Sequence, residues 1–394
     1  MVEDLLAQIR ATPHDDALRM VYADELLARG DERGEYIQLD LARAHRLTRE
    51  QRARWIELRE HQERWASELG CGETKVLWRR GFPYAVVGTV LELLGARSVM
   101  QRLPITCLVV TVATETDALA ELPELALIDE LVLDKPERDE IDPAHLAALC
   151  ASRLLGRLRS LSFRPGAMRD RFAPLIANAG WFGQLHALEV NRLTGRGLAR
   201  LLERPLPELR RLAISASQLY EEGARALARV QLPSLDDLTL YGAELRGPLR
   251  VALSNPRIGE LRRLWITDED LRHVELPPFT NLVDLGLTFG HLEYNLARFV
   301  ARSWPTLVTL DLSGNPIRDP GAYALARSDA FPKLTRLSLM NTQIRRPGAV
   351  GFKRRTGLPA LDELWLGAVH ASDHTWHAEE VVRAWFDGTN LVVL

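Results

Sequence analysis

The feature that most constrains the fold of this chain is a leucine pattern that recurs along most of its length. From about residue 125 onward, the motif L-x-x-L-x-L returns at intervals of 21 to 30 residues, usually behind a proline. Clear copies are LPELRRLAI (206–214) and WPTLVTLDL (304–312). Copies at so regular a period predict a repeat architecture. The leucines at the fourth position of the motif are Leu131, Leu161, Leu188, Leu212, Leu238, Leu264, Leu285, Leu310, Leu337 and Leu364.

The spacing of the leucines within one copy is that of a short strand. Alternate residues of a strand point to opposite faces, so one face of x-L-x-L is apolar and a single strand cannot bury it alone. Stacked copies cover one another in a parallel sheet, and segments such as EEGARALARV (221–230) are typical of helices between the strands. We therefore expect an α/β leucine-rich repeat solenoid, with a parallel inner sheet and helices on the convex side.

The fullest copy is LDLSGNPIRDPGAYALA (310–326), which resembles the ribonuclease-inhibitor type of leucine-rich repeat. Asn315 stands where the strand turns away from the sheet. Ser217 and Thr342 hold this position in other copies, which predicts a looser turn there. At the C-terminus, residues 384–394 resemble a truncated final repeat, in which we expect Leu391 and Leu394 to continue the leucine ladder.

The first 70 residues have helical periodicity and no leucine repeat. Asp15 and Asp16 are good N-terminal residues for a helix, because their carboxylates cap free N–H groups and favour the positive end of the helix dipole. The expected helices span about 2–11, from Asp15-Asp16 to Gly30, about 33–46 and about 49–69, and two strands joined by a turn follow within 76–90.

Residues 9–42, together with WRRGFPYAV (78–86), resemble the bacterial repeat-companion domain, a family that precedes repeat arrays in myxobacteria and planctomycetes. The resemblance covers about the first 90 residues and implies an architecture rather than a chemistry. The family usually has Trp after its Ala-Asp pair, whereas Glu25 follows Asp24 here. The matching positions are Pro13, Asp15, Asp16, Arg19, Tyr22, Ala23, Asp24, Gly30, Asp31, Arg33, Gly34, Glu35 and Ile37. We accordingly expect a helical capping domain over residues 1–95 and a solenoid of about 10–12 repeats over residues 96–394.

Composition argues against several classes of protein. No apolar run approaches the ~20 residues of a membrane helix, and the first ten residues do not resemble a signal peptide. Cys71, Cys107 and Cys150 are odd in number and far apart, so neither a disulfide framework nor a Cys-x-x-Cys metal clip is expected. The 50 basic residues are balanced by 53 acids, unlike the basic field of a nucleic-acid binder. We expect a cytoplasmic protein that does not bind membranes, and composition makes nucleic acid a disfavoured partner.

Motifs of the common enzyme classes are absent from the sequence. It contains no G-x-x-x-x-G-K-[ST], G-x-S-x-G or H-E-x-x-H, so we expect a non-enzymatic protein without a cofactor. Weak candidates for a metal site are His370, His374 and His377, which would share one face of a helix. The Ser-Asp pair between them instead favours a loop and an N-cap before a helix from Ala378. Asp268 and Asp270 form an acidic pair typical of a solvated loop.

The segment 43–64 is rich in arginine and allows two interpretations. A basic helix face could dock on nucleic acid or on an acidic partner. The favoured interpretation is a solvated face in which arginines pair with glutamates three or four residues away, as Glu60 and Arg64 would.

Strand geometry selects the residues that face a partner. The leucines point into the core, so the residues on either side of the fourth leucine, and the residue two positions further on, lie on the inner face. In the middle of the array these positions hold aromatic residues and arginines, the types that dominate binding hot spots. The residues expected to contact a partner are Arg211, Asp237, Thr239, Tyr241, Arg263, Trp265, Asp311, Arg336 and Trp365.

The functional hypothesis from the sequence is a protein-interaction scaffold that binds a protein or peptide on the concave face of the solenoid. Tyr241 and Trp265 would provide affinity, and the flanking charges would set orientation. Two alternatives stay open: a metal-dependent or composite-site modifying enzyme, and nucleic-acid binding through the Arg-rich segment 43–64. The sequence does not identify the partner or the oligomeric state.

Overall fold

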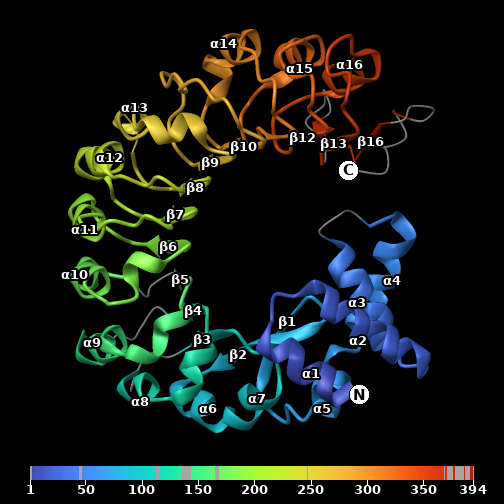
Figure 1. Cartoon of the computed structure of the whole chain (residues 1–394). Helices are drawn as coiled ribbons and strands as arrows, with labels where there is room; N and C mark the ends of the chain where they lie inside the picture. The colour runs from blue at the N-terminus through green and yellow to red at the C-terminus, as the bar shows by residue number, and fades with distance from the viewer. Residues whose placement is uncertain are drawn as a thin grey trace. The chain divides into compact units, whose positions relative to one another are not determined.

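A computed structural model describes residues 2–43, 47–111, 116–134, 143–164, 168–245, 247–367, 369–370, 376–377, 386 and 391–393 (Figure 1). The chain divides into two compact units. The N-terminal unit comprises Met1–Met168 and Asn178–Leu185, and the C-terminal unit comprises Arg169–Ala177 and His186–Leu394. The boundary expected after residue 95 lies inside the N-terminal unit, and that boundary stays a prediction.

The N-terminal unit begins with helices, as the periodicity predicts. Asp15 caps the second helix by accepting hydrogen bonds from the backbone N–H groups of Ala17 and Leu18. The expected helix over 49–69 is divided into two, and the expected third helix ends at Ala42, just before residues 44–46, which are not described. The helices are α1 (Val2–Ala11), α2 (Asp16–Ala28), α3 (Arg33–Ala42), α4 (Arg49–Arg59) and α5 (Gln62–Glu68).

Aromatic side chains form the core of these helices. Tyr22 packs against Phe82, with ring centroids 5.2 Å apart, and Tyr36 packs against Trp65 at the same separation. Tyr22, Tyr36 and Trp65 are at most 2% exposed. Gly34 lies so close to α2 that a Cβ atom there would collide with the carbonyl oxygen of Ala23, so glycine allows α2 and α3 to pack closely.

A sheet follows the helices in the same unit. Strand β1 (Lys75–Arg79) pairs antiparallel with β2 (Phe82–Gly88), as expected from the segment 76–90. Strands β3 (Cys107–Val110), β4 (Glu130–Leu133) and β5 (Ser160–Phe163) then add in parallel. Between the strands lie α6 (Val90–Gly95), α7 (Arg97–Arg102), α8 (Thr116–Ala120) and α9 (Pro143–Ala151).

The strand register shows that the leucine ladder starts earlier than the leucine motif indicates. Val86 of β2 pairs with Leu108 of β3, and Leu108 pairs with Leu131, the first leucine of the recognised motif. Val86, Leu108 and Leu131 are all buried. The sequence PITCLVV (104–110) lacks the full motif, so the pattern did not reveal this earlier row.

The C-terminal unit has the expected parallel sheet, and its helices lie along one face of that sheet (Figure 1). From β6 to β13 each strand pairs with the next in the sequence, and the leucines of the motif pair with one another, for example Leu212 with Leu238. The strands are β6 (Ala187–Asn191), β7 (Arg211–Ser215), β8 (Asp237–Tyr241), β9 (Arg263–Thr267), β10 (Asp284–Thr288), β11 (Thr309–Asp311), β12 (Arg336–Ser338) and β13 (Glu363–Trp365). The helices are α10 (Ala173–Ala177), α11 (Gly195–Leu201), α12 (Tyr220–Arg229), α13 (Leu249–Ala252), α14 (Leu296–Ala301), α15 (Arg318–Ala326) and α16 (Arg346–Gly351).

Asn315 closes the turn after β11, as its position in the motif predicts. Its Nδ2 donates to the carbonyl oxygens of Leu287 and Leu312, and its Oδ1 accepts from the N–H groups of Gly290 and Leu292. The side chain is fully buried, and these bonds tie two neighbouring repeats together.

Shorter side chains at the equivalent position make fewer bonds. Ser217 accepts from the Leu193 N–H and donates to the Ser215 carbonyl, and Thr342 donates to the carbonyl of Leu339. Glu269 also occupies this position; it is 3% exposed and accepts a hydrogen bond from the backbone of Leu245. The sequence did not reveal this role for Glu269, because its neighbours Asp268 and Asp270 made the whole segment appear solvated.

The C-terminal end differs from the expectation in two places. Strand β16 (Val392–Val393) pairs with β13 so that Val393, rather than Leu391, lies opposite Leu364. Leu391 is buried outside this row, and Leu394 lies outside the described residues. Residues Val369–His370 (β14) and Trp376–His377 (β15) pair antiparallel where a loop was expected, and the helix expected from Ala378 falls outside the described residues.

Candidate functional site

The strand register places the nine candidate contact residues on one face of the C-terminal sheet. Arg211, Asp237, Arg263 and Arg336 lie in the row just before the fourth leucine, together with Asp284, Thr309 and Glu363. Thr239, Trp265, Asp311 and Trp365 lie in the row just after it, and Tyr241 lies two residues further along. We call the first of these sets the charged row.

Neighbouring members of the charged row form ion pairs from strand to strand. Asp237 Oδ2 lies 3.0 Å from Arg211 Nε and 3.5 Å from Arg263 Nη1, and Arg263 Nε lies 3.0 Å from Asp284 Oδ2. The two aspartates are recessed, with side chains 13% and 19% exposed. The side chains of Arg211 and Arg263 are 60% and 46% exposed. Guanidinium groups are therefore the outermost charges in this part of the row.

Burial and the ion pair with Arg263 shift the pKa of Asp284 in opposite directions. Loss of hydration raises the pKa of Asp284 above its usual value, and Arg263 and a hydrogen bond from Trp265 only partly oppose this effect. The carboxylate is thus held where burial disfavours its charged form. Such a position is common at binding sites, where stability is not the only constraint.

Trp265 lies against its own sheet rather than projecting freely. Its ring occupies the space beside Gly286 on the next strand, where a Cβ atom would collide with the ring. The side chain is half-buried, so it offers less surface to a partner than the sequence led us to expect.

The more exposed apolar side chains of this face lie at or just past the C-terminal ends of their own strands. Tyr241 is 55% exposed, Trp365 39% and Met340 36%. Phe289, at 54%, was missed by sequence reasoning because it lies one residue past the inner-face positions. It occupies the left-handed backbone region, with φ of 53°, which a bulky side chain adopts only when its surroundings enforce it.

A regular turn after the strands explains why Phe289 lies where it does. In seven successive repeats the residue four positions after the motif leucine has a positive φ. Glycine, asparagine or aspartate, the residues that tolerate this conformation, stand at four of these positions, and this is the signal that could have located the turn. The seven residues are Arg192, Ala216, Gly242, Asp268, Phe289, Gly314 and Asn341.

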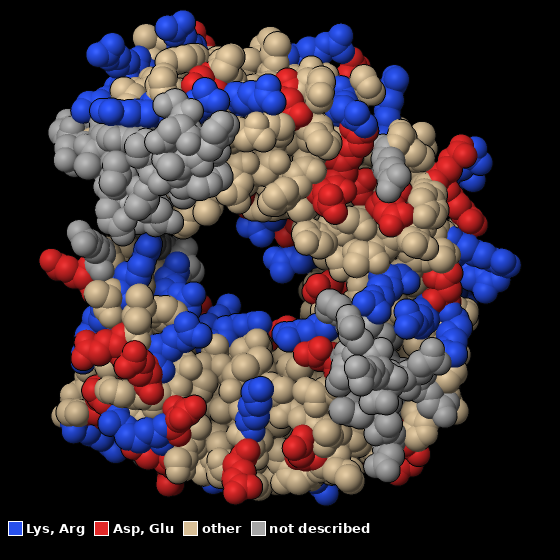
Figure 2. All heavy atoms as spheres, turned by 180° about the vertical axis from the view of Figure 1, so that it is seen from behind, with Lys and Arg blue, Asp and Glu red and all other residues tan. Residues whose placement is uncertain are grey.

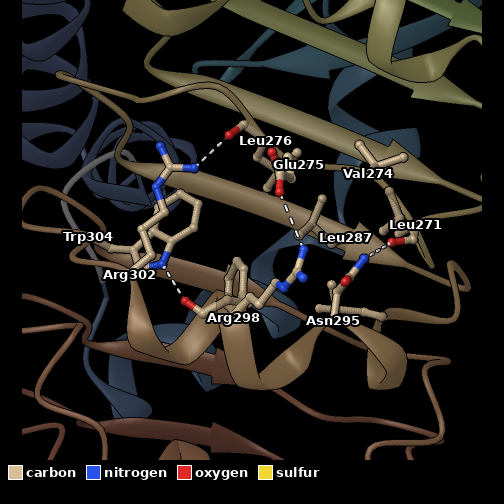
Figure 3. Close-up of a pocket in the computed structure, with 11 residues that line it drawn as sticks. Leu271, Val274, Glu275, Leu276, Leu287, Asn295, Arg298, Arg302 and Trp304 are labelled. Atoms are coloured by element: carbon tan, nitrogen blue, oxygen red, sulfur yellow. Dashed lines mark hydrogen bonds and ion pairs between the residues drawn. The ribbon is translucent and has the colours of Figure 1, made fainter.

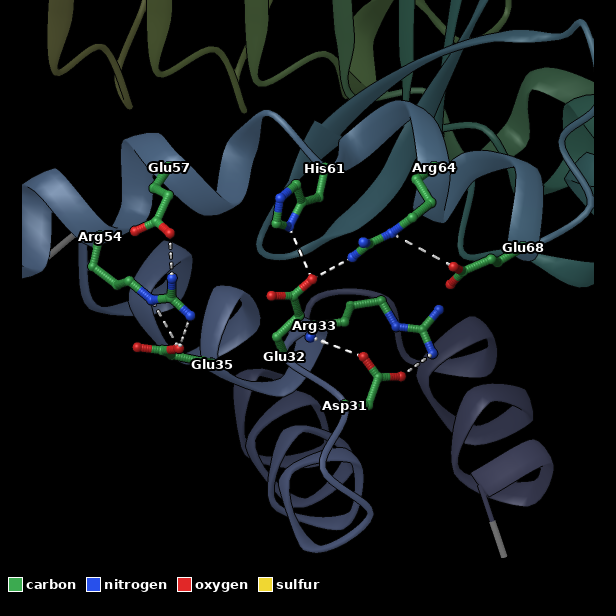
Figure 4. Close-up of polar contacts among 9 residues, drawn as sticks. All are labelled: Asp31, Glu32, Arg33, Glu35, Arg54, Glu57, His61, Arg64 and Glu68. Carbon is green, nitrogen blue, oxygen red and sulfur yellow. Dashed lines mark hydrogen bonds and ion pairs between the residues drawn. The ribbon is translucent and has the colours of Figure 1, made fainter.

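Arg54 of α4 and Arg64 of α5 pair with carboxylates (Figure 4). Two of these pairs have the predicted spacing of three or four residues, whereas the expected pair of Arg64 with Glu60 is not among the ion pairs of the described residues. Arg54 lies between Glu35 and Glu57, at 2.8 Å from each. Arg64 contacts Glu32 and Glu68, and its hydrogen bond lowers the pKa of Glu32. Figure 2 likewise shows acidic and basic side chains interspersed over the face that it presents. In the described part of segment 43–64, Arg54 and Arg64 are thus bound to carboxylates of the same chain rather than left for the phosphates of a nucleic acid.

The side chains of the three histidines named as a weak metal-site candidate lie outside the described part of the structure. Among the described side chains, no group of three His, Cys, Asp or Glu residues is placed to hold a metal ion. The backbone positions of His370 and His377 are described but not their side chains, and His374 lies outside the described residues. All three cysteines are free and buried, and burial raises the pKa of Cys150 to about 12. Asp270 pairs with Arg272 at 2.7 Å, as a surface carboxylate would.

Comparisons with known proteins agree with the repeat architecture. Residues 305–326 match the family described as "Leucine Rich repeat". The match covers a single repeat, and the strand register continues the same leucine ladder into the neighbouring repeats. A search of curated proteins finds no match. In the described parts of the chain, no helix has the length and apolar character needed to cross a membrane.

Similar solved structures share little sequence with the chain. A Bacteroides fragilis protein is 14% identical, with 71% of this chain and 68% of that one covered and a TM-score of 0.39. A chain of the yeast Rad7–Elc1 complex is 15% identical, with coverage of 74% and 80% and a TM-score of 0.41. A chain of the TLR13–ssRNA13 complex is 17% identical, with coverage of 75% and 36% and a TM-score of 0.37.

Proposed function

We propose that the protein is a non-enzymatic interaction scaffold that binds a polypeptide on the strand face of its C-terminal unit. The observation that carries the proposal is the charged row, in which arginines are exposed over recessed aspartates beside exposed aromatic side chains. Tyrosine, tryptophan and arginine are the residue types that concentrate binding energy in interfaces.

The charges of the row favour a partner segment that presents carboxylates. Arg211 uses only its Nε–H in the ion pair with Asp237, and Arg263 uses two of its N–H groups. A guanidinium has five N–H donors in a planar fork that matches a carboxylate. Within the described residues the other donors make no hydrogen bond, so they can bind an acidic side chain, and the recessed aspartates hold the guanidinium groups in place.

The exposed apolar residues would supply the affinity. Tyr241 and Met340 lie at the same register position in their repeats, and Trp365 lies on the next strand after that of Met340. A polypeptide lying across the strands would contact these side chains together with Arg263 and Arg336. Electrostatics would orient it, and burial of the aromatic rings would set the lifetime of the complex.

The N-terminal unit supports a capping role within this proposal. Strand β1 covers the edge of β2 in an antiparallel pairing, so the first parallel strand of the unit has no open edge on that side. Terminal repeats need such a cover to remain in water. A cytosolic location is also part of the proposal, on the grounds that the three cysteines are free.

The test is affinity capture from a lysate of the native host, with bound proteins identified by mass spectrometry. Wild type is compared with the double variant Tyr241→Ala/Trp365→Ala. The matched control is Tyr323→Ala, which removes a tyrosine that is 36% exposed on α15, on the helix face. We expect a protein captured by wild type and by the control but not by the double variant. Equal capture by all three would refute the proposed face.

Salt dependence tests the electrostatic part of the proposal. The double variant Arg211→Gln/Arg263→Gln should lower the association rate constant and weaken its dependence on ionic strength. An association rate that is unchanged by the double substitution would show that the charged row does not steer the partner.

A further inference from the structure

The shortest repeat of the C-terminal unit leaves a cavity in the helix layer. Only 21 residues separate Leu264 from Leu285, and the connection over residues 268–283 contains no helix. The connection includes the stiff pair Pro277-Pro278, and α14 lies beyond it in the chain. Between them is a cavity of about 250 Å³ (Figure 3). Its apolar wall is formed by Leu271, Val274, Leu276, Leu287, Leu292 and Phe299.

Hydrogen bonds hold the walls of this cavity open. Asn295 Nδ2 donates to the carbonyl oxygens of Leu271 and Arg272, each at 2.6 Å, and ties the connection to the start of α14. Trp304 Nε1 donates to the carbonyl of Phe299 at 3.1 Å. The cavity is therefore part of the folded structure and does not need to be opened by a ligand.

One of the two arginines at the cavity has no countercharge. Arg298 pairs with Glu275 at 3.3 Å, and both side chains are largely exposed. Arg302 instead donates one bond each from Nη1 and Nη2 to the carbonyl oxygens of Leu276 and Pro277, and it stacks over the ring of Trp304. Within the described residues, no carboxylate lies within ion-pair distance of Arg302.

The environment of Arg302 makes an anion favourable there. Burial lowers the pKa of Arg302, which reflects incomplete hydration of its charge, but the group remains protonated at neutral pH. A guanidinium has five N–H donors, and Arg302 uses two of them. A carboxylate could take the others in a charge-assisted pair.

We propose that this cavity binds a small apolar carboxylate, a medium-chain fatty acid, with its hydrocarbon part against the leucines and its carboxylate on Arg302. The volume suits a short chain rather than a drug-sized or long-chain ligand. The site is formed by the helix layer and is independent of the proposed strand-face function.

Isothermal titration of the full chain at neutral pH with octanoate, and separately with octanol, tests the proposal. Octanoate should bind roughly tenfold more tightly than octanol, the ratio expected for one charge-assisted pair near the surface. Equal affinities for the two ligands, or no binding of octanoate, would overturn the proposal. N-acetyl-leucine is the third ligand, and binding tighter than that of octanoate would overturn the assignment to a free fatty acid.

Three variants locate the site. Arg302→Gln should abolish the preference for octanoate, and Arg302→Lys, which keeps the charge, should retain it. If Arg302→Gln no longer binds octanol either, the result for Arg302→Lys decides between loss of the charge and loss of the cavity. If Arg302→Lys then binds octanoate no more tightly than octanol, the proposed role of the charge is overturned. Val274→Phe should fill the cavity and remove binding of both ligands; persistence of either would place the site elsewhere. The matched control Arg298→Gln should leave both affinities within twofold of wild type, and a larger loss would contradict the assignment to Arg302.

Discussion

The repeats around Leu310 and Leu264 show two solutions to the same packing problem. The Leu310 repeat has Asn315 at its turn, the helix α15 over its leucines and a full set of buried bonds. The Leu264 repeat has Glu269 at the turn and no helix before the next strand, and the cavity at Arg302 lies beside it. Both keep their strand in register. The sheet therefore tolerates variation in the helix layer, and the cavity proposed to bind a ligand lies beside the incomplete repeat.

The largest loss of stability is expected from a substitution in the Leu310 repeat, whose turn is complete. Asn315→Ala removes four buried hydrogen bonds and leaves backbone groups of two repeats unpaired, so the free energy of unfolding should fall by about 3 kcal/mol. The loss would be measured from urea denaturation followed by circular dichroism. The control is Asn281→Ala, at an exposed asparagine, which should change the stability by less than about 0.5 kcal/mol. Similar losses in both variants would contradict the role given to Asn315.

A second effect tests how the short repeat holds its tryptophan. Gly286→Val places a side chain where the Trp265 ring lies, so the ring must move outward and the free energy of unfolding should fall by about 2 kcal/mol. Tryptophan fluorescence of the folded protein should shift to the red as the indole becomes more exposed. The control Gly247→Ala adds a Cβ into open space. An unchanged emission spectrum in Gly286→Val would show that Trp265 does not rest on this glycine.

A third prediction concerns how the buried carboxylate of Asp284, in the charged row, affects the stability of the protein. The folded-state pKa of Asp284 is raised by burial, so this group favours folding most at acidic pH and loses that contribution as pH rises through its folded-state pKa. Its Oδ1 is buried and accepts no hydrogen bond within the described part of the chain. At pH 7, Asp284→Asn should therefore leave the stability unchanged or raise it by up to about 1 kcal/mol.

The measurement for Asp284 is the urea midpoint of wild type and variant at pH 4 and pH 7. The advantage of wild type over Asp284→Asn should be larger at pH 4 than at pH 7. The opposite order would mean that the ion pair with Arg263 outweighs the burial of Asp284.

The smallest expected effect concerns the turn of the short repeat. Hydrogen bonding to Arg272 lowers the pKa of Asp270 to about 2, so its stabilising contribution is complete above about pH 4 and is lost as pH falls toward 2. The side chain is 31% exposed, and solvent screening limits the contribution to about 0.5 kcal/mol. Asp270→Asn should lower the unfolding midpoint slightly at pH 7 and not at pH 2. A loss that persists at pH 2 would assign the effect to the backbone hydrogen bond that Asp270 accepts.

Much of the C-terminal unit was predictable because its interactions repeat. Alternation within L-x-x-L-x-L places Leu212 and Leu238 in the core and Arg211 and Asp237 outside it, and the period brings equivalent residues side by side. Strands β2 and β3 escaped notice because other residues stand at leucine positions: Val86 aligns with Leu108 and Leu131, and Val110 aligns with Leu133. Val393 replaced Leu391 in the final row because the register depends on pairing with β13, which the local sequence does not specify.

The sequence by itself determined the repeats, the parallel order of the strands and the face on which the side chains of the clear motif copies lie. These properties follow from a two-residue strand period and from the need to bury one apolar face, and both are visible in consecutive residues. Only the tertiary structure decided that Trp265 lies beside Gly286 and that exposed arginines pair with recessed aspartates. It also decided that Arg302 borders a cavity with no carboxylate of the described residues within ion-pair distance. Each of these depends on contacts between residues about 20 or more positions apart, where side-chain size and burial in one repeat set the environment of the next.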